Sequence, residues 1–274
     1  MESYDFLLFV AIILLSTKIF GLLSQKVNMP QVVGALLVGV LLGPSCLNIL
    51  HETDFLTKSA EIGVIFLMFL AGLDTDFDDL KATGKSSVII AFVGVLIPLG
   101  SGFLTYYLFF HGQRPDTMIF LESAFVGIVL TATSVSITVE TLREMGKLKG
   151  KMGTSILGAA IIDDVLGIIA LTIITSLADS SVNVVVVFAK IVGFFVFVGV
   201  GGYLLHVIFK KWVKGYERDL QRFVIISFVI CLLFSYCAEK FFGVADITGA
   251  FFAGLIITKT THTNYIARRF GILS

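Results

Sequence analysis

Charged residues are scarce in this chain of 274 residues, of which only 15% are Asp, Glu, Lys or Arg. A soluble domain usually carries about 25% charged residues. Hydrophobic residues make up 57% of the chain, and the mean hydropathy is +0.97. The apolar runs are far longer than the strands of about 10 residues that build membrane barrels. The composition therefore predicts an all-α polytopic membrane protein and argues against a soluble domain.

Cysteine is also rare, and the three present are Cys46, Cys231 and Cys237. Their spacing fits neither a disulfide framework nor a metal-binding motif. The four histidines fall at or near the ends of apolar runs and form no cluster in the sequence. The net charge is zero, and no basic patch is interleaved with aromatic residues. We therefore expect no cofactor and no nucleic-acid partner.

Nine apolar segments are long enough, or nearly long enough, to cross a bilayer, which takes about 20 residues of helix. The third is weak, because its clean apolar core covers only 62–73, and the last two are short. The first five residues are acidic rather than basic, which predicts a retained first span and not a cleaved secretory signal. The segments cover 6–23, 32–50, 56–73, 88–110, 118–139, 152–177, 182–209, 223–237 and 244–257.

Lysine and arginine gather on one side of these segments. Fifteen of the 20 fall in the connections after segments one, three, five, seven and nine, and three fall in the other connections. The remaining two, Lys18 and Lys190, lie within segments. Basic residues concentrate in cytoplasmic loops. The bias therefore predicts a multi-pass protein of the cell membrane with its N-terminus outside, and it supports the count of nine spans.

Two of the segments share a motif. Residues 34–41 and 249–256 both begin Gly-Ala-x-x-x-Gly, 215 residues apart, and the same offset maps segment one onto segment eight. The predicted orientation makes the two motifs run in opposite directions. Inverted repeats of this kind are typical of secondary transporters. On its own, however, the motif is also a common packing face of membrane helices.

The offset predicts a repeat unit of six spans, with the seventh span as a linker. We expect spans one to three in 1–80, spans four to six in 81–178, a linker span and cytoplasmic loop in 179–222, and the first two spans of the second repeat in 223–274. The second repeat is then incomplete, and we expect a chain truncated at its C-terminus.

Asp163 and Asp164 lie near the middle of the sixth segment, about 18 Å from its start at 1.5 Å per residue. An ionisable side chain at this depth is costly and indicates a functional site. Adjacent residues of a helix point about 100° apart, so we expect the two carboxylates to have different roles. A carboxylate can hold a proton or a metal cation, but not both at once. The alternative, a neutralised pair that only fixes helix packing, is less favoured because burial in lipid is expensive.

Segment five carries five hydroxyl side chains within eight positions. Ser and Thr can bond local backbone groups and satisfy those left free where a helix breaks. One interpretation is therefore a broken helix that offers oxygen atoms to a cation. The other is a continuous helix whose hydroxyls bond its neighbours, and the Asp pair on the next segment favours the first. The five residues are Thr131, Thr133, Ser134, Ser136 and Thr138.

The remaining acids are expected to have structural or surface roles. A cluster of four is expected in a solvated cytoplasmic loop: Asp74, Asp76, Asp78 and Asp79. Glu61 is expected near the outer end of the third segment, and Glu122 is expected to pair with another side chain. Glu140 and Glu144 are expected to form surface ion pairs, and Asp246 is expected at the start of a helix.

Four motifs, at 63–73, 131–138, 162–167 and 249–254, carry a family resemblance over essentially the whole chain. On these motifs the chain resembles bacterial sodium/proton and potassium/proton exchangers of the second branch of the cation/proton antiporter superfamily. The resemblance implies an inverted-repeat secondary transporter with two crossed broken helices. It also implies a homodimer in which a core domain moves against a dimerisation domain. By the same resemblance, spans one to three are of the dimerisation type and spans four to six form the transport core.

The same resemblance implies roles for individual residues. Asp164 is expected to carry the monovalent cation, Na+ or K+, in competition with the proton. Asp163 is expected to pair with a lysine of a later span. Thr133 and Ser134 are expected to line the site, with Thr131 beside them. The expected partners are thus a monovalent cation, a proton and the lipid bilayer.

Two alternatives to an antiporter remain from the sequence. One is a channel-like, regulated potassium efflux system of the same branch, and the other is a fragment that does not transport. An enzyme is not expected, because an intramembrane aspartyl protease needs acids that converge from different helices. Asp163 and Asp164 lie on one helix, and no second acid lies at a matching depth.

Overall fold

A computed structural model describes residues 4–112, 115–178, 183–213 and 220–258 of the chain. These residues form ten α-helices and one π-helical turn, without strands in the ranges given. The predicted basic connections after segments seven and nine fall largely in 214–219 and 259–274, outside the described residues. The elements are α1 (Asp5–Lys26), α2 (Gln31–Leu42), α3 (Asp54–Asp74), α4 (Phe77–Phe110), α5 (Asp116–Val129), α6 (Val135–Glu144), α7 (Lys151–Ala178), α8 (Val184–Val213), α9 (Leu220–Cys237), η1 (Ala238–Phe242) and α10 (Asp246–Thr258).

The helices reproduce the nine predicted segments. Six stretches are long and apolar enough to cross a membrane, and three shorter apolar helices occupy the positions of segments two, five and nine. The chain is therefore a multi-pass membrane protein, and its all-α fold class is confirmed.

Two segment boundaries were predicted wrongly. Segment two ends as a helix at Leu42 and not at residue 50, because Gly43 and Pro44 follow and the residue before a proline avoids the helical region. Helix α4 begins at Phe77 instead of residue 88, because Asp76 caps it and its carboxylate accepts a hydrogen bond of 2.7 Å from the backbone N–H of Asp78. The four acids from Asp74 to Asp79 therefore mark a helix end and a helix start rather than a solvated loop.

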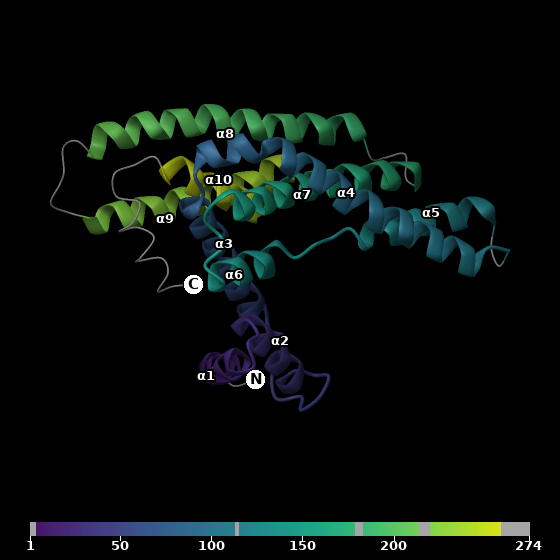
Figure 1. The fold of residues 1–274 in the computed structure, drawn as a ribbon, viewed down its shortest axis with the longest axis horizontal. Helices are drawn as coiled ribbons and strands as arrows, with labels where there is room; N and C mark the ends of the chain where they lie inside the picture. The colour runs from purple at the N-terminus through teal and green to yellow at the C-terminus, as the bar shows by residue number, and fades with distance from the viewer. Residues whose placement is uncertain (1–3, 113–114, 179–182, 214–219, 259–274) are drawn as a thin grey trace.

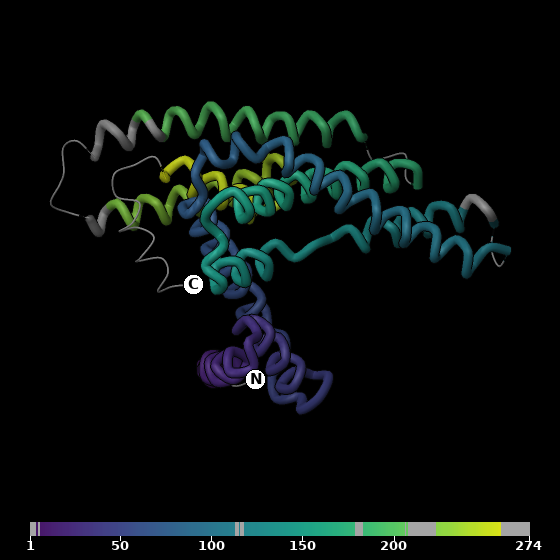
Figure 2. Tube along the Cα trace, viewed as in Figure 1, coloured from purple at the N-terminus to yellow at the C-terminus, as the bar shows by residue number. Residues whose placement is uncertain are grey.

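Figure 1 shows the helices in two regions joined by α3. Helices α4, α7, α8, α9 and α10 run beside one another, while α1 and α2 pair at the other end of the molecule. The chain trace in Figure 2 shows α6 between the two regions, beside α3. There α6 contacts α2, α3 and α7. Helix α6 thus lies at the junction between α1–α3 and the group formed by α4, α5 and α7.

The main hydrophobic core surrounds α3 and α10, which pack with their backbones in contact. A β-carbon on Gly72 of α3 would overlap the carbonyl of Phe251, and one on Gly254 of α10 would overlap the carbonyl of Phe69. Phe69 and Phe251 are fully buried. Reciprocal glycines therefore permit the close approach of these helices, as small residues do in other membrane proteins.

The predicted repeat is visible in how the paired helices pack. Gly34 of α2 lies against the backbone carbonyl of Phe20 in α1, and Gly249 of α10 lies against that of Phe234 in α9. The 215-residue offset maps Phe20 to position 235, one residue from Phe234. The helix pairs α1–α2 and α9–α10 thus repeat one glycine-mediated contact, as the motif predicted.

Candidate functional site

The hydroxyl-rich segment is a broken helix. Helix α5 ends at Val129 and α6 begins at Val135, with residues 130–134 between them in non-helical backbone (Figure 1). The interpretation of a discontinuous helix is therefore confirmed, and that of a continuous helix is wrong. A break at this position leaves backbone groups of both helix ends in need of partners.

Two threonine side chains satisfy carbonyls on the α5 side of the break. The Thr131 hydroxyl donates to the carbonyl of Ile128 over 2.8 Å, and the Thr133 hydroxyl donates to the carbonyl of Thr131 over 3.2 Å. Thr131 is buried and Thr133 is exposed. The carbonyl end of a helix also carries a partial negative charge. This side of the break is thus rich in oxygen atoms and favourable for a cation.

Ser134 and Thr138 organise the α6 side. Ser134 is the N-cap residue of α6, and its hydroxyl accepts from the backbone N–H of Ile137 over 3.5 Å. The Thr138 hydroxyl donates to the carbonyl of Ser134 over 3.0 Å. The dense hydroxyls of the sequence therefore act first as local helix terminators, which bond some of the backbone groups that the break leaves without helical partners.

A cavity of about 220 Å³ lies where the break meets α4 and α7. Its polar lining comes from Thr133 in the break, Thr138 in α6 and Asp163 in α7. Small residues keep the space open, and the rest of the wall is aliphatic. The remaining lining residues are Ile90, Ala91, Gly94, Val135, Ile156, Ala159 and Ala160.

Asp164, which the sequence favoured as the ion carrier, does not line this cavity. It follows Asp163 on α7 and therefore points about 100° away around the helix. The next residue, Val165, packs toward the small cluster around Phe194 of α8. Both aspartates are half-buried, and neither forms an ion pair within the described part of the chain. The predicted division of the pair into two surroundings thus agrees with the geometry.

The structure therefore brings some of the predicted site residues together and separates others. Asp163 and Thr133 share the cavity, whereas Thr131 and Ser134 shape the break beside it. Thr138 is an addition that the sequence pointed to only through its place in the hydroxyl run. Ala91 and Gly94 of α4 were also missed, because small apolar residues in a span carry no signal of their own.

In the part of the chain that the structure describes, no three His, Cys, Asp or Glu side chains come together in a group that could hold a metal ion. A monovalent cation needs only oxygen atoms, which hydroxyls, the backbone carbonyls of the break and one carboxylate supply here.

Other acids of the sequence are paired as follows. Glu61 forms an exposed ion pair of 2.8 Å with Lys58, and Glu122 accepts a hydrogen bond of 3.0 Å from the Tyr106 hydroxyl. Asp246 begins α10, as predicted.

Glu140 and Glu144 differ from each other. Glu140 forms the predicted ion pair, a long one of 3.5 Å with Arg143. For Glu144 the prediction of an ion pair was wrong, because its carboxylate instead accepts from the backbone N–H of Gln31, at the start of α2.

Comparison with known proteins gives a consistent result. A family model described as sodium/hydrogen exchanger, transmembrane, matches residues 11–273. The chain is 36% identical over 268 residues to the Na(+)/H(+)-K(+) antiporter GerN of Bacillus cereus, with 97% of this chain and 67% of that protein covered. It is 35% identical over 267 residues to a Na(+)/H(+) antiporter of Enterococcus hirae, with 93% and 66% covered. The chain spans about two thirds of the length of these relatives.

Among solved structures, the fold is similar to that of the sodium proton antiporter MjNhaP1 from Methanocaldococcus jannaschii. The TM-score is 0.68 at 18% sequence identity, and the match covers 98% of this chain and 68% of that one. At this identity the likeness concerns the fold alone, and it confirms the predicted fold.

Proposed function

Because the chain belongs to the sodium/hydrogen exchanger family, we propose that it exchanges a monovalent cation, Na+ or K+, for protons across the cell membrane. One observation carries the proposal. A carboxylate in the middle of an apolar helix, Asp163, faces a cavity together with the hydroxyls of a broken helix. An intramembrane acid marks an ion or proton pathway, and broken helices supply oxygen atoms to ions at such sites.

In this proposal the two aspartates divide the work. Asp164 holds either the cation or the proton, so that binding of one releases the other. Asp163 supplies a second negative charge beside Asp164 and forms an ion pair with a lysine of a later span. Since Asp163, and not Asp164, faces the break in this structure, the proposal requires α7 to shift so that Thr131, Thr133 and Ser134 can contribute carbonyl and hydroxyl oxygens to the cation held by Asp164. Competition of two ions for one carboxylate is sufficient to couple their movements.

The arrangement in the membrane is part of the same proposal. Helices α1–α3 form a dimerisation-type unit in 1–80, and α4–α7 form the moving core in 81–178. Residues 179–222 link them to the start of a second repeat in 223–274. The protein acts as a homodimer in the lipid bilayer, with its N-terminus outside. The proposed motion takes place at the junction where α6 contacts α2 and α3.

The test is cation-dependent proton flux in liposomes that contain the protein and a trapped pH-sensitive dye. Sodium or potassium added outside should enter the liposomes and drive protons outward, so that the lumen becomes more alkaline. The variant Asp164→Asn should lower this flux at least about tenfold, because an amide cannot exchange a proton for a cation. Glu61→Gln, at an exposed ion pair, is the matched control and should retain the flux. Undiminished exchange by Asp164→Asn would exclude Asp164 as the carrier.

A further inference from the structure

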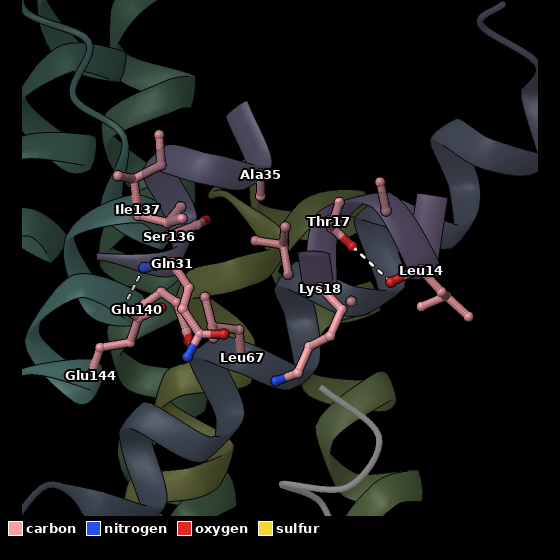
Figure 3. A pocket seen from close by; sticks show the side chains of 14 residues that line it. Leu14, Thr17, Lys18, Gln31, Ala35, Leu67, Ser136, Ile137, Glu140 and Glu144 are labelled. Carbon is pink, nitrogen blue, oxygen red and sulfur yellow. Dashed lines mark hydrogen bonds between the residues drawn. The ribbon is translucent and has the colours of Figure 1, made fainter. Parts of the chain in front are cut away.

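A second and larger cavity, of about 560 Å³, separates α6 from the helices α1, α2 and α3. Figure 3 shows that its walls come from both sides of the junction described above. Aliphatic side chains such as Leu14 and Leu67 form much of the lining. The polar lining residues are Thr17, Lys18, Gln31, Ser136, Glu140 and Glu144.

One hydrogen bond joins two walls of this cavity. The backbone N–H of Gln31 donates to Glu144 Oε2 over 2.6 Å, between residues 113 positions apart (Figure 3). Gln31 is the first residue of α2, where free N–H groups and the helix dipole favour an anion. Its preceding residue, Pro30, has no oxygen in its side chain, and the first turn of α2 contains no acid. Glu144 therefore supplies the cap that α2 lacks.

The position of Glu144 does not serve its own helix. It is the last residue of α6, where the helix dipole disfavours a carboxylate. The neighbouring Arg143 is paired with Glu140 instead. One face of α6, with Val135, Val139 and Leu142, is buried in the core around α3. Glu144 thus stabilises the contact between α6 and α2 rather than its own helix.

A second polar contact crosses the same junction. Lys149 Nζ, in the connection between α6 and α7, lies 3.0 Å from Asp74 Oδ1 at the end of α3. The lysine side chain is 71% exposed, so this ion pair contributes little. The hydrogen bond to Glu144, which is half-buried and charge-assisted, is the stronger of the two.

We propose that Glu144 is a positioning residue for ion exchange, which holds α6 and the hydroxyls of the break against α2 and must release α2 in each transport cycle. The inference rests on the proposed function, because it requires the core to move relative to α1–α3. A hydrogen bond of this length is lost over a displacement of about 1 Å. The contact is therefore made in one arrangement of the helices and absent in another, which is how packed interfaces switch.

Cross-linking gives the direct test. Gln31→Cys and Glu144→Cys are combined in a background in which Cys46, Cys231 and Cys237 are replaced by serine. At saturating cation, formation of the disulfide should lower proton flux at least about tenfold relative to the same protein in its reduced form, because the contact between the helices can no longer open. A reductant should restore the flux of the reduced form.

The matched control is a disulfide within the core. A β-carbon at position 158 lies 3.2 Å from that of Ser87, across the packed helices α4 and α7. The pair Ser87→Cys and Gly158→Cys should therefore form a cross-link that leaves the flux unchanged. Unchanged flux in the cross-linked 31–144 protein would overturn the proposal. If Asp164→Asn retains exchange while this cross-link blocks it, the proposed carrier fails and the moving contact stands.

Kinetics of single variants separate positioning from general structure. Glu144→Ala should raise the apparent KM for the cation about tenfold with less change in kcat, as expected for loss of one charged hydrogen bond. Glu144→Gln keeps an acceptor of roughly half the strength and should raise the apparent KM only about threefold. Lys149→Ala should stay within about twofold of the native protein. A KM for Glu144→Ala within twofold of the native value would contradict the proposal.

Discussion

Asp163 and Asp164 are neighbours in the sequence but have different surroundings in the fold. Only Asp163 faces the cavity with Thr133 and Thr138. Val165, the residue after Asp164, packs toward the cluster around Phe194 of α8. The sequence could predict this separation, because the geometry of a helix alone places adjacent side chains about 100° apart. It could not predict which of the two faces the cavity, since that depends on how α4 and α6 pack against α7.

The proposed roles of the two acids predict different effects of neutralising each one. Asp163→Asn should leave cation binding in place, with an apparent KM within about threefold of the native value, but change the net charge moved per cycle. The reason is that Asp163 balances charge rather than holding the transported ion. Transport currents on a supported membrane, compared with proton flux, measure this ratio. Currents identical to those of the native protein would refute the division of roles.

Thr133 offers a test of the cavity itself. Thr133→Val removes its hydroxyl at nearly constant volume, and should raise the apparent KM for the cation about threefold to tenfold through loss of one oxygen atom. Thr172→Val is the matched control, because Thr172 lies on α7, bonds the carbonyl of Ile168 and does not line the cavity. Flux measured over a range of cation concentrations separates the two. Equal effects of both substitutions would mean that Thr133 acts only on the backbone of the break.

Helices were easier to predict from the sequence than their ends. The nine apolar segments correspond to six helices long and apolar enough to cross a membrane and to three shorter apolar helices, because a long apolar run is a clear signal of a membrane helix. The ends of the break at Val129 and Val135 were not evident, since five hydroxyl residues within eight positions suit both a continuous and an interrupted helix. What decides between them is the set of local bonds from Thr131 to Thr138, and these depend on the folded backbone.

The repeated glycine motif makes a prediction about helix packing. Gly254 of α10 touches the backbone of α3, whereas its counterpart Gly39 in α2 has no atom of the described residues within 4 Å of where a β-carbon would be. Gly254→Val should destabilise the protein by about 1–3 kcal/mol or more, because helices in backbone contact cannot accept added atoms. Gly39→Val, the same change at the equivalent position, should cost much less. Thermal unfolding in detergent compares them, and equal losses would argue against the close α3–α10 contact as the cause.

The junction between helix groups could not have been inferred from the sequence. Glu144 is one of several charges near a basic connection, and nothing local distinguishes it from Glu140, which does form the surface ion pair expected of both. Its partner is a backbone N–H of α2, and a backbone group leaves no mark in a sequence. Contacts between distant segments that involve the main chain are thus the part of the site that only the fold reveals.

The orientation of the assembled chain in the membrane follows from the distribution of Lys and Arg and is open to a chemical test. Cys46 is exposed in the connection between α2 and α3, while Cys231 is buried and Cys237 is partly buried in α9. If the N-terminus lies outside, the connection after the second span is also outside. A membrane-impermeant maleimide should therefore label Cys46 in intact cells.

The control is a thiol on the other side of the membrane. In a Cys46→Ser background, Met29→Cys places a thiol in the connection between α1 and α2, where Met29 is 51% exposed. This thiol should be labelled only after the membrane is permeabilised. The reverse pattern would invert the predicted topology, and with it the side of the membrane on which the α2–α6 contact lies.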